Sequence, residues 1–384
     1  MVRLEPMGAE LLGKLKEFYS KLNEPFVGRE EEARVIVLAI LAQEHAILIG
    51  EPGTAKSALV RRAAELINAR FFKYLLTKYT EPAELFGPLD INALKQGKYV
   101  RITKGKLPEA EIVFLDEVFN ANSAILNALL SIMQERVWYD GYVEVKVPLW
   151  TLIGASNRVP DEPELEAIYD RFLLRQYTRP LPENKWSDLL EAGWRIEANL
   201  VPKPSPVLNM DDIRKLHSMI FNVDLSPVKN KLLKLYAVFE ERGVHLTDRR
   251  KTKALKVIAA NALLEGRMKA ADSDLFVLKY VAPRDIEDFD KVNIILSEEL
   301  KMPERYLREL REIKANVREA SRLISVLRSY DPRLVDLFRS LKIAKNRIMT
   351  IMREADSDSV RRLAEEVLRE VDDALEKISY KLGM

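Results

Sequence analysis

Short apolar runs alternate with helical stretches over the first half of the chain. The clearest runs cover residues 46–49, 71–76, 112–115 and 149–154. Nearly continuous apolar strands that are separated by helices are typical of a parallel sheet covered on both faces. We therefore expect an α/β domain over residues 1–182.

The pattern becomes helical beyond residue 182. Helical patterns begin near Trp186 and near Asn209, and two further helices are expected over residues 228–241 and 249–266. Asn209 is a residue type that caps helix N-termini. We expect a small helical domain over residues 183–283, which is a common size for one domain.

The remaining residues, 284–384, form long helical patterns. One apolar stripe repeats at spacings of three and four residues, as on one face of a helix; it consists of Leu363, Val367, Val371, Leu375 and Ile378. We expect a helical hairpin or a small bundle here.

Composition narrows the class of protein. The 384 residues exceed one ordinary hydrophobic core, and 47% hydrophobic with 31% charged residues is typical of a globular chain. No cysteine is present, which excludes disulfides and thiolate metal sites, and the three histidines have no metal-ligand spacing. A net charge of +2 argues against nucleic-acid binding by the whole surface. Without a long apolar run or a signal-peptide pattern, we expect a cytoplasmic protein with no membrane insertion.

A phosphate-binding loop follows the first apolar run. Residues 50–57 read Gly-Glu-Pro-Gly-Thr-Ala-Lys-Ser and lead into a helical stretch. In this Walker A context, backbone N–H groups and the helix N-terminus surround a phosphate. Lys56 is expected to reach the β- and γ-phosphates, and the Ser57 hydroxyl to bind Mg²⁺. Ala55 stands where the pattern has glycine, which the loop tolerates if Ala55 keeps φ below zero.

Polar residues end two further apolar runs. Asp116 and Glu117 follow residues 112–115, and ligands of open α/β sheets bind at the carboxyl ends of strands. Asp116 is placed to hold Mg²⁺, directly or through water, and Glu117 to polarise the attacking water. Asn157 follows the last run, so its amide is expected beside Asp116, where it can orient the water.

Taken together, these segments resemble the AAA+ ATPases, and within them the MoxR group and its RavA-like branch, in which alanine before the lysine is usual. The resemblance covers residues 20–270. Besides the motifs above, it rests on segments similar to the adenine cover, the helix-2 insertion, sensor 1, the arginine finger and sensor 2, which here are residues 26–30, 86–89 with 105–110, 154–157, 169–172 and 247–250. It implies an AAA+ P-loop NTPase domain with a helical lid domain.

The resemblance implies ATP and Mg²⁺ as cofactors and assigns roles to single residues. Arg171 would enter the site of a neighbouring subunit, and Arg249 would reach back to the phosphates from the lid. Arg175 and Arg250 stay open as alternatives to these two. Catalytic roles then fall to Glu117, Asn157, Arg171 and Arg249; nucleotide contacts fall to Val27, Gly28, Gly50, Glu51, Pro52, Gly53, Thr54, Ala55, Lys56, Ser57 and Ala58; the metal falls to Ser57 and Asp116.

The function implied is an ATP-hydrolysing homo-oligomeric ring, hexameric in such proteins, which remodels or matures partner proteins. Von Willebrand factor A domain proteins are the partners that the resemblance suggests. A nucleic-acid motor or loader, a metal-chelatase-type motor subunit and a nucleotide-binding scaffold stay as alternatives. The near-neutral charge and the lack of a recognisable DNA-binding module argue against the first of these.

Residues 136–145 predict a β-hairpin, because Asp140-Gly141 is a two-residue turn signal between alternating strands. Two interpretations of its aromatic residues stay open. Trp138, Tyr139 and Tyr142 could grip a polypeptide or a nucleic-acid strand, or they could pack across the strands of the hairpin.

Overall fold

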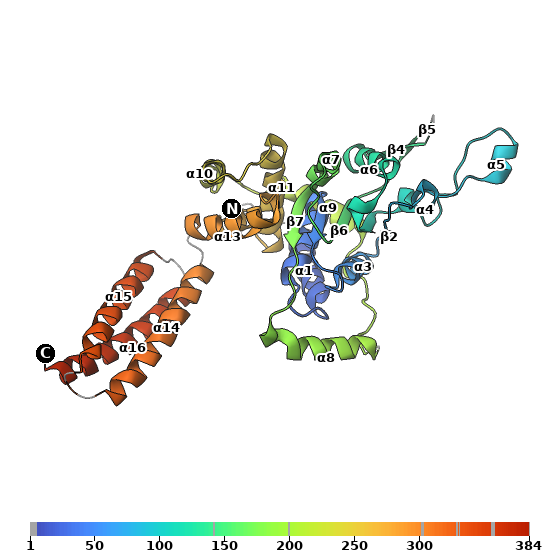
Figure 1. Cartoon of the computed structure of the whole chain (residues 1–384). Coiled ribbons are helices and arrows are strands. Elements are labelled where there is room, and N and C mark those ends of the chain that lie inside the picture. Colours follow the sequence, from blue (N-terminus) through green and yellow to red (C-terminus); the bar gives the residue numbers. More distant parts are fainter. Residues whose placement is uncertain are drawn as a thin grey trace. The chain divides into compact units, whose positions relative to one another are not determined.

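The computed structural model describes residues 6–140, 143–198, 200–300, 303–327, 329, 331–354 and 358–383. The chain separates into two compact units, Met1–Asn293 and Ile294–Met384 (Figure 1). None of the helices in the described ranges is both long and apolar enough to span a bilayer.

A five-stranded parallel sheet forms the centre of the first unit. Its order is β2-β3-β6-β1-β7, and the strands are β1 (His45–Ile49), β2 (Phe71–Leu75), β3 (Ile112–Asp116), β6 (Thr151–Ser156) and β7 (Phe172–Tyr177). The first four contain or overlap the four predicted runs, which confirms the α/β fold. The sequence did not reveal β7, because it follows helix α7 (Pro163–Arg171) without a loop and carries a buried arginine, Arg175.

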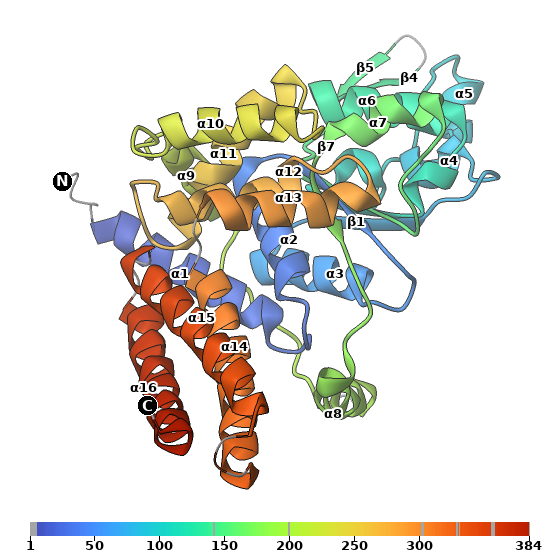
Figure 2. The same ribbon diagram turned by 60° about the vertical axis from the view of Figure 1, so that its left-hand side comes forward.

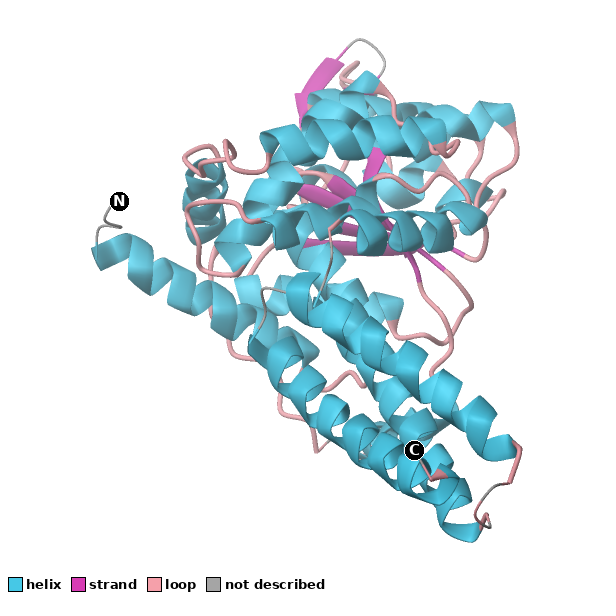
Figure 3. Cartoon of the chain, turned by 90° about the vertical axis from the view of Figure 1, so that its left-hand side faces the viewer, coloured by secondary structure: helices cyan, strands magenta, loops and turns pink. Residues whose placement is uncertain are grey.

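Helices cover both faces of the sheet, as Figure 3 shows. Alternate strand residues such as Val113, Leu115 and Leu152 share one apolar cluster with α6 (Ser123–Glu135) and α7. Strand contacts outside this cluster come from α2 (Glu30–Ala42) and α3 (Lys56–Ile67), and α1 (Pro6–Asn23) packs on these two helices.

Two projections leave the sheet. The predicted hairpin is confirmed as β4 (Val137–Asp140) and β5 (Val143–Lys146), while Gly141 and Tyr142 at its tip lie outside the described residues. Short helices α4 (Pro82–Phe86) and α5 (Ile91–Lys95) precede the 3₁₀ turn η1 (Leu107–Glu109), and a second 3₁₀ turn, η2 (Val118–Asn120), follows β3.

The helical part of the first unit agrees closely with the predicted helices. It contains η3 (Glu183–Lys185), α8 (Trp186–Glu197), α9 (Met210–Ile220), α10 (Lys229–Glu241), α11 (Asp248–Leu264), η4 (Asp272–Val277), α12 (Leu278–Val281) and the first part of α13 (Ile286–Glu299). The Asn209 carboxamide oxygen accepts from the Asp212 N–H at 2.9 Å, as expected of an N-cap.

The boundary between the compact units follows Asn293, about three helical turns beyond residue 283, the expected end of the lid. The ring of Phe289 in α13 lies 6.0 Å from that of Tyr177 in β7, and Asp290 accepts from Arg179 at 2.7 Å. The start of α13 is therefore fastened to the sheet. The division at residue 182 stays a prediction.

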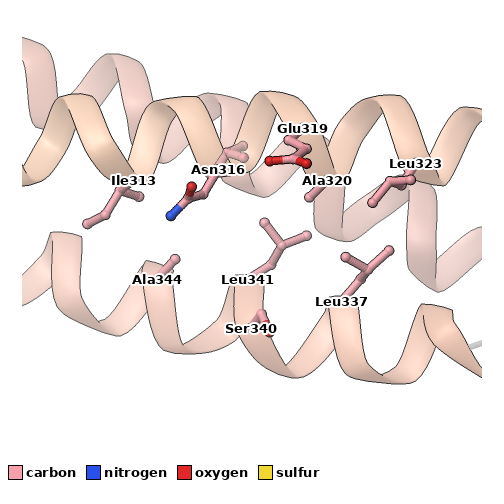
Figure 4. Close-up of a pocket in the computed structure, with 10 residues that line it drawn as sticks. Ile313, Asn316, Glu319, Ala320, Leu323, Leu337, Ser340, Leu341 and Ala344 are labelled. Carbon is pink, nitrogen blue, oxygen red and sulfur yellow. The ribbon is translucent and has the colours of Figure 1, made fainter.

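The second unit is a three-helix bundle of α14 (Pro303–Val326), α15 (Arg333–Glu354) and α16 (Asp358–Leu382). The predicted apolar stripe lies on α16, where Val367, Val371 and Ile378 are fully buried. Between α14 and α15 an apolar cavity of about 290 Å³ remains, and Figure 4 shows Ile313 facing Ala344 across it.

Candidate functional site

The phosphate loop connects β1 to α3 at the carboxyl end of the sheet. Gly50 needs its missing side chain, since a Cβ there would lie 2.3 Å from the Thr178 carbonyl oxygen. Ala55 has φ 63°, which contradicts the expectation that it keeps φ below zero. A left-handed alanine is strained by about 1–2 kcal/mol, so the loop holds this conformation against the preference of its own residue.

Lys56 begins α3 and is buried. Its Nζ donates to the carbonyl oxygens of Gly50 and Glu51, each at 2.7 Å, and to Thr54 Oγ1 at 3.2 Å. Burial lowers the pKa of the Lys56 ammonium, while Asp116 and Glu117 oppose that shift. The lysine is thus held at the loop with all three of its donors engaged.

Asp116 and Glu117 lie at the end of β3, as predicted. Glu117 adopts φ 51°, and its N–H donates to Asp116 Oδ1 at 3.1 Å. Burial raises the pKa of Glu117, and the neighbouring Asp116 carboxylate raises it further, whereas Lys56 lowers it. A carboxylate of raised pKa close to a lysine can accept a proton nearer neutral pH than an ordinary glutamate.

Asn157 follows β6, which lies between β1 and β3 in the sheet. The Gly50 N–H donates to the Ser156 carbonyl at 2.9 Å, so the residue before Asn157 is bonded to the phosphate loop. Leu115 pairs with Gly154 on the other side of β6. The topology therefore brings Asn157 between the loop and Asp116, and its side chain is exposed.

The segment with Val27 and Gly28 lies against the chain that leaves β7. Gly28 has φ 64°, and a Cβ there would lie 2.5 Å from Leu181. Arg29, which sequence reasoning did not single out, is buried, donates to the Arg179 carbonyl at 2.9 Å and pairs with Glu32 at 3.6 Å. Its charge also lowers the pKa of Lys56, which places this segment near the loop.

Ser57 and Asp116 supply the oxygen donors that a magnesium ion prefers. The Ser57 Oγ accepts from Lys73 Nζ at 2.9 Å. Lys73 lies on β2, and its position inside a predicted apolar strand was a signal that sequence reasoning did not use. The donor set fits Mg²⁺, because such ions take only one or two protein ligands beside phosphate oxygens and water.

Four arginines gather at the opposite, amino end of the sheet, and two of them are buried. Arg175 donates to the Pro283 carbonyl at 2.8 Å, and its guanidinium lies 3.8 Å from the centre of the Tyr169 ring. Arg250 donates to the carbonyls of Phe172 and Leu173 at 3.1 and 2.6 Å. Burial, followed by the charge of Arg175, lowers the pKa of Arg250 to about 9. Both side chains join β7 to the helical part.

The other two arginines, Arg171 and Arg249, are only partly buried. Arg171 donates to Gln134 Oε1 at 2.6 Å, and after burial the charge of Arg249 is the next cause of its lowered pKa. The structure therefore brings Arg171 and Arg249 near each other. It does not bring Arg249 to the phosphate loop of its own chain, because α11 is fastened at the amino end, where Lys253 Nζ pairs with Glu44 at 2.6 Å.

Each of the three histidines contacts backbone atoms or a surface carboxylate. His45 is buried, accepts from the Leu152 N–H at 2.9 Å and has a pKa well below its usual value because of burial. His217 contacts the Leu41 carbonyl at 2.8 Å, and His245 pairs with Glu240 on the surface.

Comparison with known proteins identifies this arrangement. A family model of the MoxR domain in MoxR–vWA–β-propeller ternary systems matches residues 13–218, and a model of an AAA lid domain matches residues 223–296. The chain belongs to the MoxR family of AAA+ ATPases. The lid match begins in the loop after α9 and ends in α13, the helix that the structure fastens to the sheet.

Relatives of this MoxR protein agree with the assignment. Two uncharacterized proteins of Methanocaldococcus jannaschii are 42% and 41% identical, over 74% and 73% of both chains. The chaperone MoxR1 of Mycobacterium tuberculosis is 26% identical over 56% of this chain and 58% of its own length. The crystal structure of a candidate ATPase from Cytophaga hutchinsonii, 20% identical, covers 77% of this chain and 95% of its own with a TM-score of 0.64, which supports the fold.

Proposed function

We propose that this MoxR protein hydrolyses ATP as one subunit of a homo-oligomeric ring, hexameric by family resemblance, and uses that energy to remodel protein clients. The observation that carries the proposal is the coupling of Lys56 with Asp116 and Glu117 at one end of the sheet. A lysine, a metal-binding carboxylate and a carboxylate of raised pKa are the groups that phosphoryl transfer to water requires.

Each residue has a defined task in this proposal. Lys56 exchanges the carbonyls of its own loop for the β- and γ-phosphates of ATP. Ser57 and Asp116 would hold Mg²⁺, which neutralises phosphate charge when it is bound. Glu117 orients the attacking water and takes its proton, and Asn157 holds the same water from β6.

Arg171 and Arg249 serve the site of an adjacent copy in this proposal. His45 at the start of β1 pairs with Phe172, directly after Arg171, whereas the phosphate loop follows the other end of β1. Five residues of strand span about 16 Å, so Arg171 is too far from the loop of its own chain. A finger and a sensor that lie close together at this end fit the open side of a neighbour's site.

The partner of this ATPase is a protein in our proposal. The name of the matching family model associates MoxR domains with vWA partners, and the relative MoxR1 is named a chaperone. We therefore infer a von Willebrand factor A domain protein as partner or client.

ATP binding and turnover test the proposal. Glu117→Gln should bind ATP with wild-type affinity in titration calorimetry and release phosphate at less than about 1% of the wild-type rate, because a general base contributes about 10²–10⁴-fold. Lys56→Ala should lose binding. Glu164→Gln and Lys215→Ala, at two exposed positions, are the matched controls and should keep both ATP binding and turnover. Wild-type turnover by Glu117→Gln would defeat the proposed chemistry.

A further inference from the structure

An arm over residues 87–106 projects from the first unit beside the hairpin, and Figures 1 and 2 both place α4, α5 and β4–β5 at the same end of that unit. The two sides of the arm pair with each other, since the Asp90 N–H donates to the Val100 carbonyl at 2.8 Å and the Ile102 N–H to Pro88 at 2.9 Å. The Asp90 side chain caps α5 by accepting from Asn92 at 2.8 Å. Backbone hydrogen bonds and a helix cap therefore give the arm a defined conformation.

Arg101 fastens the arm to the hairpin. Its Nε donates to the Asp140 carboxylate at 3.0 Å, and its guanidinium lies 5.9 Å from the Trp138 ring. Trp138 is 4% exposed and stacks on Phe86 at 5.0 Å. Of the aromatic residues predicted either to grip a strand or to pack, Trp138 thus packs, whereas Tyr139 points to solvent with 55% exposed.

The arm exposes apolar side chains that its own fold does not use. Five large residues are between 46% and 67% exposed: Ile91, Leu94, Tyr99, Val100 and Ile102. On the neighbouring hairpin Tyr139 and Val143 are about half exposed. Folded proteins rarely leave several large apolar side chains exposed close together on one projecting element, so this group of residues is a candidate surface for binding another molecule.

The charge of the arm is strongly basic. Residues 87–106 contain five lysines and arginines against one acidic residue, although the whole chain has a net charge of only +2. Lys95, Lys98 and Lys104 are exposed and pair with no carboxylate among the described residues. The acidic side chains nearby are mostly engaged, since Asp140 holds Arg101 and Glu135 accepts from Tyr139; Glu144 on β5 is exposed.

We propose that the arm and the hairpin bind an unfolded polypeptide segment that is rich in acidic and apolar residues. This inference rests on the proposed function and specifies its client. Lysines supply attraction for carboxylates, and aliphatic side chains supply apolar contact area. Single-stranded nucleic acid would instead favour a basic groove lined by stacking aromatic rings. Four of the five exposed apolar residues on the arm are aliphatic, namely two isoleucines, one leucine and one valine.

Binding of labelled peptides to the full chain tests the inference. Glu117→Gln protein with ATP and Mg²⁺ is titrated against four fluorescent probes of matched length: a Glu/Leu peptide, a Lys/Leu peptide, a Glu/Ser peptide and single-stranded DNA. We expect the Glu/Leu peptide to bind at least tenfold more tightly than the others. The triple variant Lys95→Glu, Lys98→Glu, Lys104→Glu should lose that peptide and gain the Lys/Leu peptide.

A matched triple variant controls for net charge. Lys203→Glu, Lys215→Glu and Lys229→Glu change the charge equally at exposed positions outside the arm, and this protein should bind the Glu/Leu peptide as before. In the wild-type background both triple variants should hydrolyse ATP at the unstimulated rate, which separates this test from that of the proposed function. Tighter binding of DNA, equal binding of all peptides, or equal loss in both triple variants would each overturn the inference.

Discussion

The two ends of the sheet differ in their charge and in how firmly their functional groups are held. The carboxyl end carries Asp116 and Glu117 together with strained backbone. The amino end carries four arginines, of which Arg175 and Arg250 are buried and bonded to carbonyl oxygens, while Arg171 and Arg249 stay partly exposed. In our proposal, one end therefore supplies the groups that bind the nucleotide and activate water, and the other supplies additional positive charge.

This difference explains why one chain is an incomplete motor in our proposal. The cations that would stabilise charge on a transferred phosphoryl group lie about one strand length from the loop that would bind it. A head-to-tail contact between copies would join the amino end of one chain to the carboxyl end of the next. Such heterologous contacts close into rings when the rotation permits.

Removal of Arg171 should have the largest effect. An arginine finger is worth about 10³–10⁵ in turnover, so Arg171→Ala should lower steady-state phosphate release by that order. Its melting temperature should change little, because the partly buried side chain makes one hydrogen bond to Gln134 and a long ion pair with Asp170. Arg195→Ala, an exposed arginine on α8, is the control and should retain wild-type turnover.

Mixing two inactive variants shows whether Arg171 acts between copies. Arg171→Ala keeps a working loop, and Lys56→Ala keeps a working finger. Mixed oligomers should recover part of the activity if subunits exchange. Full turnover by Arg171→Ala in a protein that light scattering shows to be monomeric with ATP would contradict the division of labour between the two ends.

Removal of Arg250 should affect folding. Arg250→Met leaves the carbonyls of Phe172, Leu173 and Val281 without their donor. Loss of one member of a buried charged cluster costs about 3–5 kcal/mol, so the urea midpoint of the tryptophan fluorescence transition should fall markedly. The neighbouring Arg249→Met should change the free energy of unfolding by less than about 0.5 kcal/mol. Equal shifts for both variants would remove the distinction between locked and available arginines.

Most of the fold could be predicted from periodicity, and the reason is visible in the strands. β1, β3 and β6 are almost wholly buried, so they appear as continuous apolar runs. β7 was not predicted, because Arg175 interrupts its apolar pattern. Only the folded structure supplies the carbonyl oxygens and the Tyr169 ring that let an arginine be buried there. The arm had no hydrophobic period, since its apolar residues face solvent.

The pH dependence of turnover should reflect the carboxyl end alone. Glu117 acts as a base only when ionised, and its pKa is raised by burial and by Asp116. Turnover should therefore be full above that raised pKa and fall about tenfold per pH unit below it. A flat profile down to the ordinary glutamate pKa, about 4.3, would show that Glu117 is not the base.

The candidate site was predictable where a motif fixes a local shape, and not where the answer depends on tertiary position. Each motif residue lies at the boundary of a helix or strand that the nearby sequence already indicates: α3 begins at Lys56, β3 ends at Asp116, and Asn157 follows β6. Whether Arg249 faces the loop of its own chain depends on where α11 packs, and Glu44 with Lys253 decides that at long range. The local sequence pattern also gave the wrong expectation for Ala55, whose φ is positive.

The smallest effect concerns backbone strain, which the comparison assigns to the carboxyl end. In the part of the chain that the structure describes, five residues other than glycine have positive φ, and three of them are helix C-caps, where the left-handed conformation is common. The other two, Ala55 and Glu117, both adjoin the phosphate site. Ala55→Gly should raise the free energy of unfolding by up to about 1 kcal/mol, because glycine adopts this φ without strain. Ala58→Gly is the matched control. Ala58 lies inside helix α3, where glycine is less favourable than alanine, so this substitution should lower the free energy of unfolding by a similar amount. Opposite signs from the same substitution three residues apart would place the strain in the loop, and a loss of stability in both would show that Ala55 is not strained.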